Sequence, residues 1–297
     1  MSIVPVLILL SQIYGAVSDV VRADFDPTEG GRRLNPACES EALRHTNGNA
    51  PSLESLVGAS GSDKARQGNG RGHHGYTRYY ERILKPLRHE PVRFVEIGVE
   101  RGRSLKAWQQ YFTRADHVYG IGYGTFQTTP SQACSSNAGT HVATRANCTI
   151  FMGDQSKSEF LHHFIDETGG SFDVVVDDGS HVPSHQMISF ETLWPSVKPG
   201  GMYIVEDIET SWWKPTASIY GYSLANEINV VEKWRGLVDT VNREFTHGRS
   251  LLTDENAAVY TSIASVEFGQ NIIIFYKALE GEEDFLEKPY RFQFNVK

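Results

Sequence analysis

The fold is decided by two stretches of sequence, FDVVVDDGSH at residues 172–181 and GMYIVED at residues 201–207. Each stretch contains a short apolar run, which is typical of a strand buried inside a parallel sheet. Each then ends in acidic residues. The carboxyl ends of parallel strands meet at one edge of an open α/β sheet, and ligands bind at that edge. The acids therefore mark a candidate binding site.

These strand ends supply Asp178, Glu206 and Asp207, and His181 follows on the first loop. A cluster of carboxylate oxygens suits a hard divalent cation such as Mg²⁺. The acids could instead cap the helices that follow, but capping explains the pair Glu206 and Asp207 poorly, because like charges repel unless something neutralises them. We therefore predict a metal site with His181 beside it as a base. The alternative for His181 is a solvated side chain without a role.

The chain of 297 residues is 40% hydrophobic and 22% charged, with a formal net charge of −8. This composition is typical of a globular protein, and the negative charge argues against nucleic acid as the main partner, because phosphates require clustered Lys and Arg. The cysteines, Cys38, Cys134 and Cys148, are too few for a disulfide scaffold or a zinc site. Isolated thiols are favoured over a single disulfide.

Residues 1–18 are largely apolar and end in small residues, which predicts a secretory signal peptide, with a packed helix or an anchor as the alternative. The protein would enter the secretory pathway in the first case and be cytoplasmic otherwise. The apolar run is too short for a confident membrane span, and no other membrane association is expected. Residues 19–52 are expected to form a linker. Residues 53–297 form one domain, of which residues 53–90 are a cover of helix and loop.

From residue 91 onward, strands and helices alternate. Strands are expected at residues 93–98, 117–121, 149–152, 172–176 and 201–205, and helices at residues 76–87, 104–112, 156–165, 184–194 and 224–244. Two further strands, 259–267 and 271–277, form a C-terminal hairpin. Residues 124–147 are expected to form a surface loop. This order predicts an α/β fold with a Rossmann-like, mostly parallel sheet and an antiparallel edge hairpin.

Further motifs follow the other strands. The glycines between Glu96 and Gly102 let the backbone approach a ligand at a helix N-terminus, although they are not a G-x-G-x-x-G motif and a tight packing turn is the alternative. Asp154 and Gln155 are suited to reading a base edge or to capping a helix. The pair at residues 73–74 (His-His) is placed at the mouth of the site. The pair at residues 212–213 (Trp-Trp) is read either as substrate-facing or as a packed corner.

Together the motifs resemble a known family. In chain order they are GSDK (61–64), HGYT (74–77), FVEIGV (94–99), SLKAW (104–108), GDQ (153–155), DDGSH (177–181) and VEDI (205–208). The chain resembles the class I S-adenosylmethionine-dependent methyltransferases of the macrolide-sugar O-methyltransferase type, over about residues 53–213. The resemblance implies a seven-stranded sheet with helices on both faces and a reversed last strand.

The resemblance also implies roles for individual residues. S-adenosylmethionine would contact Ser62, Glu96, Ile97, Gly98, Val99, Ser104 and Asp178, with its adenine at Asp154 and Gln155. The Mg²⁺ ligands would be Asp178, Glu206 and Asp207, and His181 would accept the proton. The acceptor would be a small molecule, a sugar or a glycosylated natural product. A homo-oligomer is left open.

The chain departs from the family at Gly122, where an acid normally binds the ribose hydroxyls. A hydrogen bond to a charged group contributes roughly 1.5–3 kcal/mol. Cofactor affinity is therefore expected to be roughly tenfold to a hundredfold lower, unless the inserted loop at residues 124–147 replaces the contact. The expected function is a Mg²⁺-dependent O-methyltransferase acting on a sugar or polyol hydroxyl. The alternative is a non-catalytic, methyltransferase-like binding protein; a nicotinamide-dependent oxidoreductase is disfavoured because its glycine motif is missing.

Overall fold

The computed structural model describes residues 50–66, 73–124, 141–145, 147–243 and 257–281. The expectations for residues 1–18, and for nearly all of the predicted linker at residues 19–52, lie outside this part of the chain.

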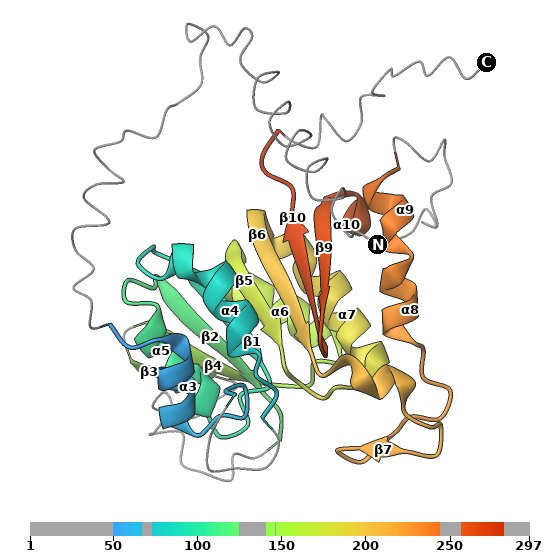
Figure 1. Cartoon of the computed structure of the whole chain (residues 1–297), viewed down its shortest axis with the longest axis horizontal. Coiled ribbons are helices and arrows are strands. Elements are labelled where there is room, and N and C mark those ends of the chain that lie inside the picture. The colour runs from blue at the N-terminus through green and yellow to red at the C-terminus, as the bar shows by residue number, and fades with distance from the viewer. Residues whose placement is uncertain (1–49, 67–72, 125–140, 146, 244–256, 282–297) are drawn as a thin grey trace, which may run out of the picture. The chain divides into compact units, whose positions relative to one another are not determined.

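The centre of the described domain is one sheet of eight strands (Figure 1). Its spatial order is β3 (His141–Arg145), β4 (Cys148–Met152), β2 (His117–Gly122), β1 (Arg93–Ile97), β5 (Phe172–Asp177), β6 (Val197–Glu206), β10 (Ile272–Lys277) and β9 (Ile263–Gly269). Strands β4, β2, β1, β5 and β6 are parallel, and β10 runs antiparallel to both β6 and β9. The predicted mostly parallel sheet of seven strands with a C-terminal hairpin is confirmed.

The eighth strand was not expected. Strand β3 lies within residues 124–147, which the sequence predicted as a surface loop, and it pairs antiparallel with β4. Its Val142 and Thr144 are β-branched residues that favour a strand. The pairing satisfies backbone groups of β4, which would otherwise be the open edge of the sheet. The loop prediction is therefore wrong for residues 141–145.

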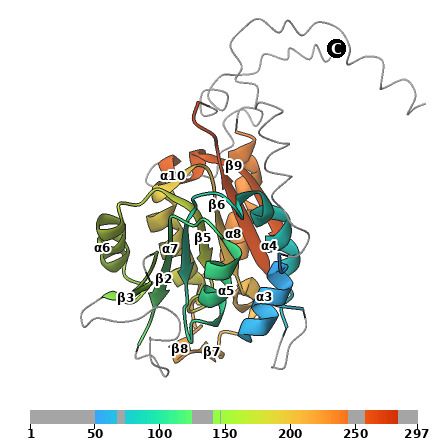
Figure 2. The same cartoon turned by 90° about the vertical axis from the view of Figure 1, so that its left-hand side faces the viewer.

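Helices cover both faces of the sheet (Figures 1 and 2). Successive side chains of a strand point to opposite faces, and the buried apolar residues accordingly form two clusters, one containing Phe94 and the other Val95. The first face packs against α3 (Leu53–Ser60), α4 (Thr77–Leu84) and α5 (Arg103–Tyr111). The second packs against α6 (Ser158–Thr168), α7 (Pro183–Leu193), α8 (Val230–Arg235), α9 (Leu237–Val241) and α10 (Ala257–Thr261).

Some predicted helices differ from the structure. The single helix expected at residues 224–244 is replaced by α8 and α9, because Asn229 accepts a hydrogen bond from the Glu232 N–H and so starts α8, and Gly236 separates the two. Helix α6 begins at Ser158 and not at residue 156; Lys157 is its N-cap residue, and no side chain caps the helix. Helix α4 gives way to a 3₁₀ turn at Lys85–Leu87, where Pro86 cannot donate a backbone hydrogen bond.

The structure bears on the predicted state of the cysteines and on membrane-spanning helices. Cys148 is in a disulfide bond, so the expectation of isolated thiols is wrong for this residue. Thiol pairing depends on where the chain brings cysteines together, which their spacing does not reveal. Within the described ranges, none of the helices has both the length and the apolar character needed to cross a bilayer.

The strand register aligns the residues that matter for the site. Asp177 pairs with Val205 on one side and with Ile97 on the other. Asp178, Glu206 and Gly98 consequently follow at the same level, at the carboxyl edge of the sheet. A two-stranded hairpin, β7 (Ser218–Ile219) and β8 (Tyr222–Ser223), follows the 3₁₀ helix η4 (Ile208–Trp212).

Gly98 allows the ends of β1 and β5 to approach each other. Its φ is +97°, and a Cβ at this position would lie 1.7 Å from the Asp178 carbonyl oxygen. We expect Gly98→Ala to lower the free energy of unfolding by roughly 2–4 kcal/mol, because it adds backbone strain and a clash that forces the strand ends apart. Urea denaturation measures this change.

Gly169→Ala is the matched control, because Gly169 has φ +74° but no atom within 4 Å of its added Cβ. Gly169→Ala adds the backbone strain without the clash and should lower the free energy of unfolding by about 1–2 kcal/mol. Equal losses in the two variants would contradict the close-approach explanation.

Candidate functional site

A cavity of about 1310 Å³ opens at the carboxyl edge of the sheet, where the sequence places the site. Its wall contains residues that follow β1, β2, β4, β5 and β6, together with the Gly58–Asp63 segment and the β7–β8 hairpin. Of the predicted site residues, the structure places Ser62, Ile97, Gly98, Val99, Ser104, Asp154, Gln155, Asp178, His181 and Asp207 in this wall. Glu96 and Glu206 are not in the wall; they are buried, with exposed fractions of 0% and 1%.

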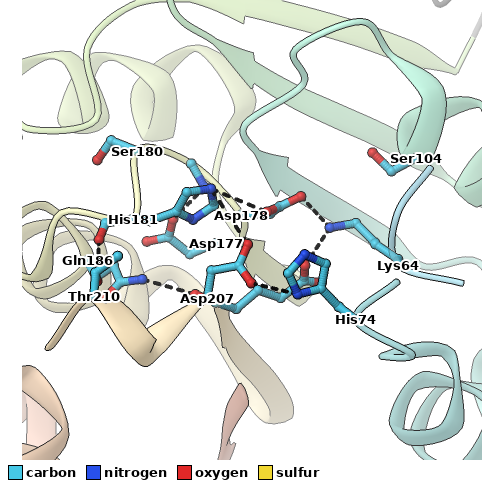
Figure 3. Close-up of polar contacts among 12 residues, drawn as sticks. Lys64, His74, Ser104, Asp177, Asp178, Ser180, His181, Gln186, Asp207 and Thr210 are labelled. Carbon is cyan, nitrogen blue, oxygen red and sulfur yellow. Dashed lines mark hydrogen bonds and ion pairs between the residues drawn. The ribbon is translucent and has the colours of Figure 1, made fainter. Parts of the chain in front are cut away.

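Asp178, His181 and Asp207 converge on one point of the cavity (Figure 3). One potential ligand atom from each lies within 4.8 Å of the others. His181 Nε2 is 3.6 Å from Asp207 Oδ2 and 4.0 Å from Asp178 Oδ1. His181 Nδ1 is buried and has no hydrogen-bond partner among the described residues. The two carboxylates offer oxygen ligands that fit a hard divalent cation, and the imidazole lies beside them.

The backbone of this group is held in an uncommon conformation. His181 and Asp207 have φ values of +56° and +53°, in the left-handed region that residues other than glycine rarely adopt. The Thr210 hydroxyl donates a 2.6 Å hydrogen bond to the His181 carbonyl, and the Asp207 N–H donates one of 3.0 Å to the Asn271 carbonyl. These bonds fix the direction in which both side chains leave the backbone.

Lys64 lies beneath the acids, and sequence reasoning did not identify it as a site residue. Its side chain is 1% exposed. Its ammonium donates to Asp178 Oδ2 and, at 2.6 Å, to Glu206 Oε2, and lies 3.8 Å from Glu96 Oε1. Burial alone would lower the pKa of Lys64, but the charges of Asp178, Glu206 and Glu96 raise it well above its ordinary value. The surrounding acids therefore favour the charged form of Lys64.

Glu206, a predicted metal ligand, has a different set of neighbours from the two aspartates. Its carboxylate accepts hydrogen bonds from Lys64 and from the Tyr80 hydroxyl. Burial raises the pKa of Glu206, and Lys64 opposes that shift. The structure thus groups His181 with Asp178 and Asp207 and directs Glu206 toward the cover. Its place in a ligand set stays a prediction.

Glu96 also faces the protein interior. It accepts hydrogen bonds from Ser104 Oγ at 2.9 Å and from Trp108 Nε1 at 3.0 Å. Burial raises its pKa to about 7, and Lys64 acts in the opposite direction. In this position Glu96 holds the first turn of α5 and Lys64 together. The resemblance placed it along the cofactor, whereas the described structure places it below the cavity wall.

The cover segment supplies a second imidazole. His74 Nδ1 is 3.3 Å from Asp207 Oδ1, and its ring stacks on Tyr76 at a centroid distance of 5.1 Å. The Tyr76 hydroxyl donates to the same aspartate oxygen. His73 and His74 both lie in the cavity wall, as the sequence placed them. Asp207 is thereby enclosed by two histidines and a tyrosine.

Gln155 supports the acidic loop from within. Its Nε2 donates to Asp177 Oδ1 at 3.1 Å and to Ser189 Oγ at 3.0 Å, while its Oε1 accepts from the Ser180 N–H at 2.7 Å. These internal bonds already occupy the amide that was expected to read adenine. Asp154 accepts from the Ser156 N–H at 2.9 Å, which is close to the capping alternative, but it also lies in the cavity wall.

Other predicted features also have definite positions. Gly122 lies in the cavity wall at the end of β2, so no carboxylate is present at that point. Trp212 and Trp213 are 60% and 42% exposed and are not in the wall. The packed-corner interpretation of this tryptophan pair is therefore wrong, because both rings are exposed, and their position outside the cavity wall gives the substrate-facing interpretation no support.

Lys64→Met should destabilise the protein by about 3–5 kcal/mol, because it leaves buried carboxylates without their cation. The loss of stability relative to the wild type should become smaller as the pH falls from 8 to 5, because the unpaired acids can then take up protons. Urea denaturation with a chelator present measures both effects. Lys85→Met, at an exposed position, should have little effect. A loss for Lys64→Met that does not depend on pH would contradict the electrostatic explanation.

Residues 95–208 match a family described as a methyltransferase domain. L-olivosyl-oleandolide 3-O-methyltransferase of Streptomyces antibioticus is 31% identical over 224 residues, which cover 73% of this chain and 53% of that protein. The 8-demethyl-8-alpha-L-rhamnosyl tetracenomycin-C 2'-O-methyltransferase of Streptomyces olivaceus is 34% identical over 209 residues, 68% of this chain and 48% of that protein. The chain thus spans about half the length of these curated relatives.

Solved structures support the same fold. The structure of the MycE methyltransferase from the mycinamycin biosynthetic pathway, in complex with Mg, SAH and mycinamycin VI, has a TM-score of 0.58 and 22% sequence identity. The match covers 87% of this chain and 69% of MycE. The predicted resemblance is confirmed: residues 95–208 match a methyltransferase domain, and the chain is similar to macrolide-sugar O-methyltransferases.

Proposed function

We propose that this protein is a Mg²⁺-dependent O-methyltransferase that transfers a methyl group from S-adenosylmethionine to a hydroxyl of a sugar or another polyol. The observation that carries the proposal is the convergence of Asp178, His181 and Asp207 in the wall of one cavity. Its relatives are named as O-methyltransferases that act on glycosylated natural products, and MycE was crystallised with Mg and SAH. A small glycosylated molecule is accordingly the proposed acceptor.

The cofactor is proposed to lie along the first turn. Ile97, Gly98 and Val99 form the bend after β1, and Ser104 lies in the first turn of α5. A glycine with φ +97° lets the backbone come close to a ligand, and a helix N-terminus favours a carboxylate such as that of the methionine part. Ser62 faces the same space from the cover, and Asp154 marks the proposed adenine end.

Asp178 and Asp207 are the residues best placed to hold Mg²⁺, with Glu206 as the third ligand that the resemblance implies. A divalent cation bound there would lower the pKa of a hydroxyl that it coordinates. Lys64 keeps part of the negative charge neutralised beneath the aspartates, so that fewer charges face the cavity. The acceptor hydroxyl is proposed to meet these groups from the cavity side.

His181 is the proposed general base. A base must lie within hydrogen-bonding reach of the proton that it removes. The His181 ring is 10% exposed, its Nε2 faces the two aspartates, and Thr210 holds its backbone. The chain therefore provides a fixed imidazole beside the proposed position of the hydroxyl. Methyl transfer then needs oxygen, methyl carbon and sulfur in line, which the rigid strand ends favour.

The proposal is tested by following a labelled methyl group from S-adenosylmethionine to a glycoside acceptor, with and without a chelator. We expect chelation to abolish transfer and Mg²⁺ to restore it. His181→Ala should lower kcat by roughly a hundredfold to ten-thousandfold and leave the Kd for S-adenosylmethionine within twofold, because a general base acts on turnover. His162→Ala, on the exposed side of α6, is the control.

Two outcomes would count against the proposal. Transfer that persists in the chelator would exclude the metal. A parallel loss of cofactor binding and turnover in His181→Ala would make His181 a structural residue.

A second candidate function rests on Gly122. Without an acid at the end of β2, the chain lacks the carboxylate expected to bind the ribose hydroxyls, which favours a non-catalytic binding protein with weak cofactor affinity. Calorimetry separates the two candidates, since no heat at millimolar S-adenosylmethionine would support the binding protein.

Gly122→Asp is expected to increase the affinity for S-adenosylmethionine by roughly tenfold to a hundredfold, because a new carboxylate can accept two hydrogen bonds from the ribose. Gly124→Asp adds the same charge at a position with no neighbour within 4 Å and should leave the affinity unchanged. Calorimetric titration measures both values. An unchanged Kd for Gly122→Asp would mean that the ribose is held elsewhere.

A further inference from the structure

The β7–β8 hairpin carries an aromatic residue in a conformation that is unfavourable for it. Its turn residues, Tyr220 and Gly221, have φ values of +50° and +86°. Two-residue turns with both φ values positive favour Asn, Asp or Gly at the first position, because a larger side chain is strained there. A tyrosine at this position therefore needs an explanation other than the turn itself.

Backbone strain of this kind is concentrated at the cavity. The described residues other than glycine with positive φ are Glu100, Ser171, His181, Asp207, Tyr220, Asn226 and Asn271. Four of them, Glu100, His181, Asp207 and Tyr220, lie in the cavity wall. Two of these four are the proposed base and a proposed metal ligand. Strained residues that cluster at one cavity point to function.

Burial does not compensate for the strain at Tyr220. The residue is 72% exposed, in contrast with the fully buried Tyr80 and Tyr203. Its recorded ring contact within the described part of the chain is with His181, at a centroid distance of 5.7 Å and an interplanar angle of 42°. Most of the residue is thus open to solvent, and it lies in the cavity wall. The ring adds an apolar wall beside the polar groups of His181, Asp178 and Asp207.

Taken with the proposed function, on which this inference rests, the geometry points to Tyr220 as a specificity-determining residue that stacks against the C–H face of a pyranose ring in the acceptor. A pyranose has hydroxyls at its rim and a flat patch of C–H groups on its face. The rim hydroxyls suit the carboxylates and His181, and the C–H patch suits the face of an aromatic ring. An open-chain polyol has the hydroxyls but lacks the flat face.

Substitutions of Tyr220 distinguish the role of its aromatic ring from its role in the turn. Tyr220→Asn removes the ring and suits the positive φ, so the fold should be at least as stable as that of the wild type. Tyr220→Phe keeps the ring and removes only the hydroxyl. Thermal denaturation of the full chain confirms that both variants are folded.

Binding is measured by saturation-transfer NMR on the full chain with Mg²⁺ and S-adenosylhomocysteine, so no turnover is needed. The probes are methyl α-L-rhamnopyranoside and the open-chain polyol sorbitol. We expect Tyr220→Asn to raise the Kd for the rhamnoside at least fivefold and Tyr220→Phe to change it less than twofold. Neither variant should alter the Kd for sorbitol or for S-adenosylhomocysteine.

Several outcomes would overturn the inference. The first is a rhamnoside Kd in Tyr220→Asn that equals the wild-type value. The second is a loss of rhamnoside affinity in Tyr220→Phe that is as large as in Tyr220→Asn. The third is the absence of rhamnoside binding by the wild type. Failure of the proposed function looks different. If the wild type binds the rhamnoside through Tyr220 but never transfers a labelled methyl group, methyl transfer is rejected and the stacking role remains.

Discussion

The buried ammonium group of Lys64 allows acidic side chains from the ends of three strands to meet at the edge of this sheet. Glu96, Asp178, Glu206 and Asp207 come from the ends of β1, β5 and β6, and like charges repel one another strongly when water is excluded. Lys64 lies within 4 Å of carboxylate oxygens of the first three. The acids around this lysine form two groups. Glu96 and Glu206 are buried around it, whereas Asp178 and Asp207 also face the cavity.

The ammonium belongs to the cover segment, so the cover and the site form together. The Thr77 N–H donates to the Lys64 carbonyl at 3.2 Å and fixes the loop to the start of α4. From the same segment, Tyr80 and Tyr76 donate their hydroxyl protons to Glu206 and Asp207. Three strand ends and one cover segment thus share one network of charges and hydrogen bonds. Because a charge left unpaired in this network is costly, the cover cannot separate from the sheet without disrupting the acids.

The sequence predicted the sheet better than the site. Apolar runs such as Val174–Val176 and the acids that end them depend on local pattern, so the strands and the binding edge followed from the sequence. Lys64 did not, because its partners Asp178 and Glu206 are 114 and 142 residues away. The resemblance placed Glu96 along the cofactor, but its hydrogen bonds from Ser104 and Trp108 of α5 could not be read from the sequence. The strands β7 and β8 have two residues each, too few for any periodic pattern.

The direction in which a side chain points is the property that is hardest to predict from the sequence. In this site the strained backbone conformation sets that direction. At His181 and Asp207 a positive φ points the side chain away from where an extended backbone would carry it, and hydrogen bonds to the His181 carbonyl and from the Asp207 N–H keep it there. Such conformations persist only where surrounding structure enforces them. Thr210 and Asn271, which supply those bonds, lie in η4 and in the β9–β10 turn, outside the motifs that indicated the family. The arrangement of the site therefore depends as much on these connections as on the acids themselves.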